Sequence, residues 1–172
     1  LLVFAKSEVA NRSLTEQFAR RQVHKEYRLV TDRRVDFKER TVECALVRMG
    51  GRYVARTRHA GTATAVTHFR FVSAEAERVQ LIAEPITGQT HQIRAQAASR
   101  GFPILGDQRY GGTGPKPPTP ARLWLHAETL MLRHPATGER LRFHAPADFA
   151  AHRAIALRTA FIDPEETNAY RV

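Results

Sequence analysis

A short helix-forming stretch near the middle of the chain carries a residue well suited to chemistry. Arg94 lies within the sequence THQIRAQAASR, residues 90–100. Ile93 and Ala97 lie four residues apart and would give a helix a small apolar stripe, which places Arg94 about 100° around the axis, at the edge of the buried face. An arginine there can bind a carboxylate or a phosphate in a cleft, because its planar fork matches both. The alternative is an ordinary surface arginine on an amphipathic helix.

The residues on both sides of Arg94 predict where its helix begins and ends. A strand-like run at 78–83 is stopped by Pro85, which has no N–H to donate to a sheet. Thr87 and Gly88 are turn residues, and Thr87 or Thr90 is expected to cap a helix over 91–100. Gly101 can end that helix in the left-handed conformation. The pattern therefore predicts a strand, a tight turn and a short helix that presents Arg94.

Four stretches in sequence order resemble RluA-type RNA pseudouridine synthases. They are LLVFAK at 1–6, KEYRLV at 25–30, PITGQTHQIR with GFPILGDQRYG at 85–111, and RLWLHA at 122–127 followed by HPATGE at 134–139 and FHAP at 143–146. The resemblance implies an α+β domain with a mostly antiparallel mixed β-sheet flanked by a few helices. It also implies an isomerase that converts uridine to pseudouridine in rRNA or tRNA and needs neither cofactor nor metal.

The resemblance also implies roles for particular residues. The reaction extrudes a uridine from the RNA, detaches its base from C1′ and reattaches it through C5. Arg94 would pair bidentately with a nucleophilic aspartate and keep it ionised, and Tyr27 would lie under the uracil with its hydroxyl available for proton transfer at C5. Leu125 would form the apolar floor of the pocket. Further candidates for substrate binding are Thr90, Gln92, Arg56 and Arg58. A half-buried strand tyrosine and a core leucine are the alternatives for Tyr27 and Leu125.

The chain departs from the family pattern in three places. The family aspartate occurs in an HRLD-x-x-TSG loop before the segment that LLVFAK resembles, and residues 1–172 contain no such string. We expect that loop in an upstream part of a longer protein; Asp107 is expected to cap local backbone. Gln89 stands where the motif has arginine, which removes a charge for phosphate, and Gln96 stands where histidine is common. A catalytically inactive RNA-binding relative and a structural RNA-binding protein remain the alternative functions.

Composition points to a polyanionic partner. The 172 residues carry a net charge of +10, and residues 1–60 hold 14 Lys and Arg against 7 Asp and Glu. We expect a single domain over 1–172, a cytoplasmic monomer that binds structured RNA. Nucleic acid fits the charge better than a membrane does, because no apolar run approaches the roughly 20 residues needed to span a bilayer. The single cysteine, Cys44, excludes an internal disulfide and is expected to be buried. The histidines lack metal-ligand spacing, and no nucleotide-binding string occurs, so we expect no metal and no cofactor.

The remaining pattern predicts the elements that position these residues. Leu1–Ala5 is an apolar run typical of a buried strand. A helix capped by Ser7 or Asn11 is expected to end near Arg21, with Val9, Leu14 and Phe18 facing inward. Gly50 and Gly51 predict a hairpin between strands at 41–48 and 53–57. Further expected elements are strands at 27–30, 63–72, 79–84, 123–132 and 140–143, a loop at 111–120 and a helix at 148–158.

Overall fold

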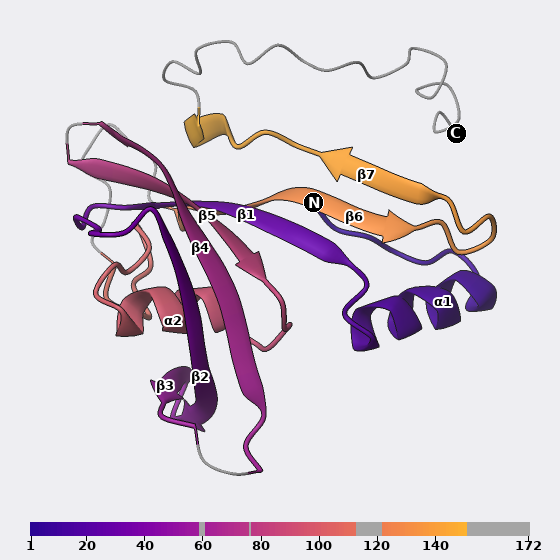
Figure 1. Cartoon of the computed structure of the whole chain (residues 1–172), viewed down its shortest axis with the longest axis horizontal. Helices are drawn as coiled ribbons and strands as arrows, with labels where there is room; N and C mark the ends of the chain where they lie inside the picture. The colour runs from indigo at the N-terminus through magenta and orange to yellow at the C-terminus, as the bar shows by residue number, and fades with distance from the viewer. Residues whose placement is uncertain (59–60, 76, 113–121, 151–172) are drawn as a thin grey trace.

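The computed structural model describes residues 1–58, 61–75, 77–112 and 122–150 (Figure 1). Seven strands form one sheet in the order β3-β2-β4-β5-β1-β6-β7, and all neighbouring strands in it pair antiparallel. The expected α+β class with a mostly antiparallel sheet is confirmed. The strands are β1 (His24–Thr31), β2 (Glu39–Met49), β3 (Arg52–Arg56), β4 (Thr64–Glu75), β5 (Arg78–Pro85), β6 (Leu125–Arg133) and β7 (Arg140–His144). The helices are α1 (Glu8–Ala19), α2 (Gln92–Ser99) and a 3-10 turn at Asp148–Ala150.

Glycine residues form a turn of the sheet, and a proline ends one of its strands, at the positions that the sequence predicts. Met49 pairs with Arg52, so Gly50 and Gly51 form the two-residue hairpin turn between β2 and β3. Gly50 has φ +58, the left-handed conformation that this kind of tight turn uses. The strand β5 ends at Pro85, as expected. These local signals hold because each concerns a backbone conformation that few residues can adopt.

Two apolar clusters hold the fold together. The larger one lies between the sheet and α2 and includes Leu29, Phe69, Leu81, Ile93 and Phe102, all 7% exposed or less. The rings of Phe69 and Phe102 meet edge to face with centroids 5.2 Å apart. The smaller cluster lies under α1 and is formed by Leu14, Val23, Leu130 and Leu132. Burial of each large apolar side chain contributes about 1.5–3 kcal/mol, so the larger cluster dominates stability.

The prediction of a buried strand at Leu1–Ala5 is wrong. The segment is irregular, and Leu2 and Phe4 are 85% and 81% exposed. The physical reason is that β6 already pairs with β1 along one edge and with β7 along the other. The segment 1–5 therefore finds no free edge of β6 with which to pair. The backbone nitrogen of Leu1 donates instead to the carbonyl oxygen of Ala127, 2.9 Å away.

The first helix is capped as expected but buries a narrower face. Ser7 Oγ accepts a hydrogen bond from the N–H of Ala10 at 3.2 Å, and Leu14 is buried. Val9 and Phe18, expected to face inward, are 69% and 42% exposed. Because α1 packs only against the small cluster at β6, a single line of its residues is covered, and Gln17 takes the second buried position.

The second helix ends as predicted but begins differently. Gly101 has φ +83 and terminates α2. The expected threonine cap is wrong, because the capping position is His91, with φ +55 and no side-chain cap. The side chain of Gln92 reaches back instead and accepts from the N–H of Gln89 at 3.1 Å. Most of the helix predicted at 148–158 and of the loop at 111–120 lies outside the described residues.

Candidate active site

A pocket of about 260 Å³ opens where β1, the start of β6 and the segment before α2 meet. Its lining includes Tyr27, Arg94, Leu125 and Gln92, four residues that the sequence singled out in three separate stretches. The remaining lining residues are Lys25, Pro85, Thr87, Gly88, Gln89, His91 and Ile93. No carboxylate is among these residues, so the pocket is cationic.

The central position of β1 in the sheet explains why these residues meet. Tyr27 lies opposite Ala83 of β5 on one side and Ala127 of β6 on the other. The chain leaves β5 at Pro85 and turns into α2, which brings Arg94 back over the same end of the sheet. Leu125, the first residue of β6, lies opposite Leu29. Sheet pairing therefore assembles the pocket from residues about 100 positions apart in sequence.

Tyr27 presents a protonated hydroxyl to the pocket. Its side chain is half-buried and packs against the large cluster. Burial raises the pKa of the Tyr27 hydroxyl above its ordinary value, so it keeps its proton at neutral pH. Within the described part of the chain, that hydroxyl makes no hydrogen bond. Its proton is therefore available to a bound molecule.

Arg94 is held in place by Asp107. Its Nε donates to Oδ2 at 2.8 Å and its Nη2 donates to Oδ1 at 2.7 Å, a bidentate pair. The Asp107 side chain is fully buried and also accepts from the N–H of Tyr110 at 3.2 Å, so the predicted backbone cap is confirmed. The hydrogen bonds to Asp107 raise the pKa of Arg94 above its ordinary value. Asp107 uses only one edge of the guanidinium, and Nη1 has no partner among the described residues.

Buried amides attach α2 to the sheet. The Gln96 side chain is completely buried; its Nε2 donates to the carbonyl oxygens of Val42 and Ala65 at 3.1 and 3.0 Å, and its Oε1 accepts from Thr67 at 2.5 Å. Gln92 donates to Val66 O and to Thr67 Oγ1, both at 2.9 Å. The Gln92 amide is thus occupied by the protein, which favours a positioning role over substrate contact.

The other predicted substrate-binding residues lie elsewhere. Thr90 is exposed and does not line the pocket. Arg56 and Arg58 line a separate hollow of about 450 Å³ together with Arg100 near the end of α2. Arg58 also forms an ion pair with Glu43. The structure therefore brings Tyr27, Arg94, Leu125 and Gln92 together and leaves the other three residues apart from them.

Sequence reasoning missed Lys25 and His91 as pocket residues. Lys25 precedes Tyr27 by two positions on one strand, and strand alternation alone would place both side chains on one face. Burial lowers the pKa of Lys25. His91 Nδ1 lies 3.0 Å from the Tyr110 hydroxyl, and burial followed by Arg94 and Arg109 lowers the pKa of this histidine, so it is neutral at pH 7. The left-handed backbone of His91 had no sequence signal.

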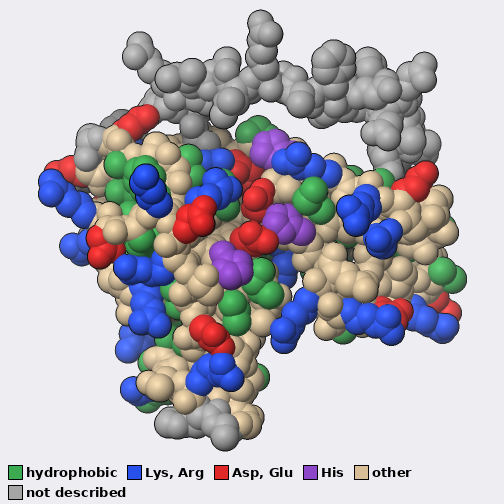
Figure 2. Space-filling model, in the orientation of Figure 1, with side chains coloured by type: hydrophobic (Ala, Val, Ile, Leu, Met, Phe, Trp, Pro, Cys, Tyr) green, Lys and Arg blue, Asp and Glu red, His purple; other side chains and the backbone are tan. Residues whose placement is uncertain are grey.

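The sheet face opposite to Tyr27 carries balanced charge. Glu84 follows Ala83, the partner of Tyr27, and so points to the other face. His24 Nδ1 lies 3.0 Å from Glu84 Oε1 on that face. Figure 2 shows acidic and histidine side chains mixed with lysine or arginine side chains across the middle of the face in front of α2. A polyanion is therefore better matched by the pocket side.

The described ranges hold neither a metal-binding cluster nor a membrane-spanning helix. No group of three or more His, Cys, Asp or Glu there is arranged to hold a metal ion. None of the helices of this part of the chain combines the length and apolar character needed to cross a bilayer. Cys44 is buried, as expected.

Known proteins are similar in sequence to most of this chain. A family model described as RNA pseudouridylate synthase matches residues 1–99. The chain is 34% identical over 169 residues to the ribosomal large subunit pseudouridine synthase C of Salmonella typhimurium, covering 90% of this chain and 51% of that protein. It is 35% identical over 153 residues to the dual-specificity RNA pseudouridine synthase RluA of Haemophilus influenzae, covering 87% of this chain and 68% of that protein. The chain thus spans about half the length of several curated relatives that it matches.

The fold is shared with solved structures. Human RNA Pseudouridylate Synthase Domain Containing 1 superposes with a TM-score of 0.69 at 23% identity, covering 84% of this chain and 63% of that one. Human RNA Pseudouridylate Synthase Domain Containing 4 superposes with a TM-score of 0.63 at 26% identity, covering 83% and 65%. The first of these likenesses concerns the fold alone.

Proposed function

Because the chain belongs to the RNA pseudouridylate synthase family, we propose that the protein containing it isomerises uridine to pseudouridine in structured RNA. The observation that carries this proposal is the convergence of Tyr27, Arg94 and Leu125 on one pocket from three distant stretches. The pocket offers a flat ring with a proton, a cation and an apolar wall. These are the groups that exchange of a glycosidic bond on a flipped nucleotide requires.

The residues present can divide the reaction among them. A carboxylate in the complete protein, outside residues 1–172, attacks the sugar or supports its charge as the C1′–N1 bond breaks. Arg94 keeps that carboxylate ionised through Nη1 while Asp107 holds the other edge of the guanidinium. The freed uracil turns between Tyr27 and Leu125, and a C5–C1′ bond forms. As the C5–H bond breaks, the Tyr27 oxygen accepts the C5 proton while the proton that the hydroxyl already carries passes to N1, which restores the aromatic ring.

The substrate and setting follow from charge and relatives. A net charge of +10 suits RNA. The Salmonella relative is named for the ribosomal large subunit, so we propose rRNA as the first target to test and tRNA as the second. The continuous sheet supports a single catalytic domain over 1–172. We further propose a cytoplasmic monomer that works without cofactor or metal.

Substitution of Arg94 tests the proposal in the complete protein. Arg94→Met keeps the apolar stem but leaves two carboxylates without a cation, and such groups take up protons. Arg94→Lys keeps the charge and loses the two-pronged geometry. We expect pseudouridine formation per enzyme on total cellular RNA to fall nearly to background with Met and to a small fraction with Lys.

A thermal melt of each variant accompanies the activity measurement. Burial of the Asp107 carboxylate without its partner lowers the melting temperature, and Asp107→Asn combined with Arg94→Met restores part of it without restoring activity. An active, folded Arg94→Met protein would contradict the assignment. An unaltered protein that forms no pseudouridine in rRNA or tRNA would instead support the inactive relative.

A further inference from the structure

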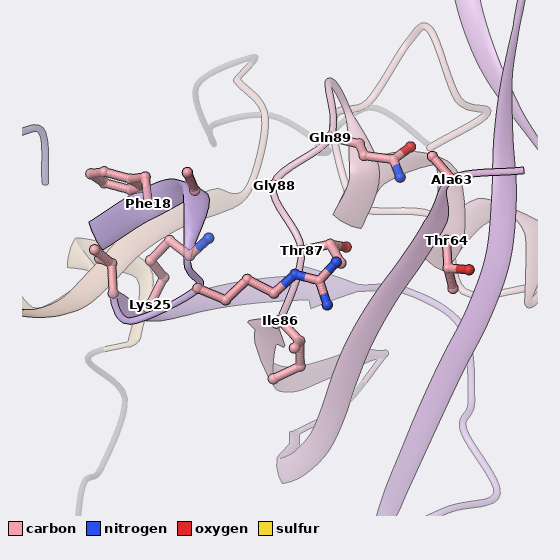
Figure 3. A pocket seen from close by; sticks show the side chains of 11 residues that line it. Phe18, Lys25, Ala63, Thr64, Ile86, Thr87, Gly88 and Gln89 are labelled. Atoms are coloured by element: carbon pink, nitrogen blue, oxygen red, sulfur yellow. The ribbon is translucent and has the colours of Figure 1, made fainter. Parts of the chain in front are cut away.

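A second hollow of about 360 Å³ adjoins the proposed active site. It lies between the end of α1 and the Thr87–Gln89 turn, with Phe18 and Lys25 on one side, Thr64 and Gln89 on the other, and Thr87 between them (Figure 3). Lys25 and the turn line both this hollow and the pocket that contains Tyr27 and Arg94. The two hollows are therefore neighbouring compartments separated by one lysine side chain and one turn.

The second hollow is positively charged and uncompensated. Arg21 and Lys25 both line it, and none of its lining residues is acidic. Within the described ranges neither cation forms an ion pair with a carboxylate. Burial lowers the pKa of Lys25, which is the expected result for a cation without a neighbouring anion. An anion bound here would offset the free-energy cost of burying the charged Lys25 ammonium.

The turn beside these cations can approach a ligand closely. A methyl group added to Gly88 would lie 3.7 Å from Lys25 Nζ, so the lysine ammonium lies over the bare backbone of this glycine. Gln89, which stands where an arginine occurs in the family motif, lines the same hollow. Arg21 reaches this place from the turn after α1 and Lys25 from β1, and together they supply the charge that position 89 lacks. A single positive group is compatible with many ligands. Two cations next to the accessible backbone of Gly88 favour phosphate, which carries negative charge and accepts several hydrogen bonds.

We infer that this hollow is a subsite for an internucleotide phosphate of the RNA, next to the nucleotide that enters the Tyr27 pocket, with Arg21 and Lys25 as its charged ligands. The inference rests on the proposed function. Binding of the phosphate holds the RNA strand beside the pocket while the base occupies it. Lys25, shared by both compartments, links the backbone contact to the position of the flipped nucleotide.

Arg21 offers a substitution that removes charge without harming the fold. Its backbone has φ +58, which favours glycine over any residue with a side chain. Arg21→Gly therefore should leave the melting temperature unchanged or raise it. The matched control is Arg142→Gln on the exposed edge strand β7. Arg142 pairs with Met131, which pairs with His24, so this charge lies on the sheet face opposite to Lys25.

Binding of the complete protein to polyuridylate over a range of salt concentrations tests the subsite. Each lost phosphate contact lowers the log–log slope by about 0.7 for a single strand. We expect this drop for Arg21→Gly, about twice as much when Lys25→Gln is added, and no drop for Arg142→Gln. With a methylphosphonate backbone, which carries no charge, unaltered protein and Arg21→Gly should bind alike.

The inference is overturned if Arg21→Gly and Arg142→Gln show the same slope, or if unaltered protein shows no salt-dependent binding. Its failure is distinct from failure of the proposed function. A protein that forms pseudouridine with an unchanged slope in Arg21→Gly lacks only the phosphate subsite. A protein that loses the slope as expected but forms no pseudouridine keeps the subsite and lacks the activity.

Discussion

The candidate active site depends on three side chains with different physical tasks. Tyr27 contributes a ring and a proton, Arg94 contributes a charge with a fixed orientation, and Asp107 supplies that orientation from a fully buried position. A buried carboxylate is costly unless it is paired, so Asp107 and Arg94 stabilise each other's placement. The single bidentate contact thus pairs the buried Asp107 carboxylate and fixes the orientation of Arg94.

Replacement of Tyr27 by Phe separates stacking from proton transfer. The variant keeps the ring that would lie under uracil and removes the hydroxyl, whose burial-raised pKa keeps it protonated at neutral pH. We expect RNA binding by the complete protein to persist and pseudouridine turnover to fall by about 10²–10⁴, the range for a general acid–base group. Single-turnover rates measured beside a binding isotherm check this, and a wild-type rate would reduce Tyr27 to a packing role.

At the scale of elements, α2 is the part that must be placed accurately. It has only eight residues, too few to form a stable helix alone, and therefore relies on tertiary contacts. The Gln96 amide connects it to β2 and β4 through Val42 and Ala65. Histidine, common at this position in the family, has one N–H donor when neutral and could satisfy only one of these carbonyl groups.

Substitution of Gln96 by Leu tests whether this amide positions Arg94. The change leaves buried carbonyl groups without donors, which costs about 1–3 kcal/mol for each unsatisfied group. We expect a lower melting temperature and lower pseudouridine turnover per folded molecule. Gln17→Leu is the matched control, because the buried Gln17 amide bridges to Arg133 backbone away from the pocket. Turnover should survive in the control despite a similar loss of stability.

The sequence could predict elements whose signals are local. The Gly50–Gly51 turn, the end of α2 at Gly101 and the strand end at Pro85 each follow from a restricted backbone, and all three are confirmed. The strand expected at Leu1–Ala5 is wrong because burial of an apolar run depends on a free sheet edge, and sequence does not show which edges are occupied. The exposure of Val9 on α1 could not be read from its periodicity either, because the sequence does not show that α1 packs only against the small cluster at β6.

The site itself was predictable only in part. Tyr27, Arg94 and Leu125 lie in sequence stretches that resemble the pseudouridine synthase family, and the structure places them in one pocket. The pairing of Arg94 with Asp107 spans 13 residues and depends on how the chain turns after Gly101, which no local pattern encodes. Their catalytic roles stay predictions that the substitutions above test.

At the scale of the whole molecule, basic groups are distributed around the pocket rather than within it alone. Arg56 and Arg58 line the hollow near the end of α2, on the hairpin side of the sheet, and Arg21 lies at the end of α1. A structured RNA that contacts both would extend across the pocket side of the domain. The opposite face mixes acidic side chains with basic ones (Figure 2).

Simultaneous replacement of Arg56 and Arg58 by Ala tests this extended contact. RNA affinity of the complete protein should fall, and the log–log salt slope should flatten by about 0.7 to 0.9 for each lost phosphate contact. Arg58 also pairs with Glu43, so a single Glu43→Gln variant shows how much of any effect comes from that pair. An unchanged slope in the double variant would mean that this hollow does not touch RNA.

The position of β1 between β5 and β6 has a consequence for the order in which the molecule forms on the ribosome. Arg28 of β1 and Glu128 of β6 form a buried ion pair across 100 residues of sequence. At synthesis rates of roughly 5–20 residues per second, one edge of β1 waits about 5–20 s for its partner strand. During that interval β1 can pair with β5, but the Tyr27 pocket lacks its Leu125 wall and presents an open strand edge to other chains. The edge of β1 beside the candidate active site is therefore open to mispairing during synthesis, and a chaperone that covers it would protect the pocket.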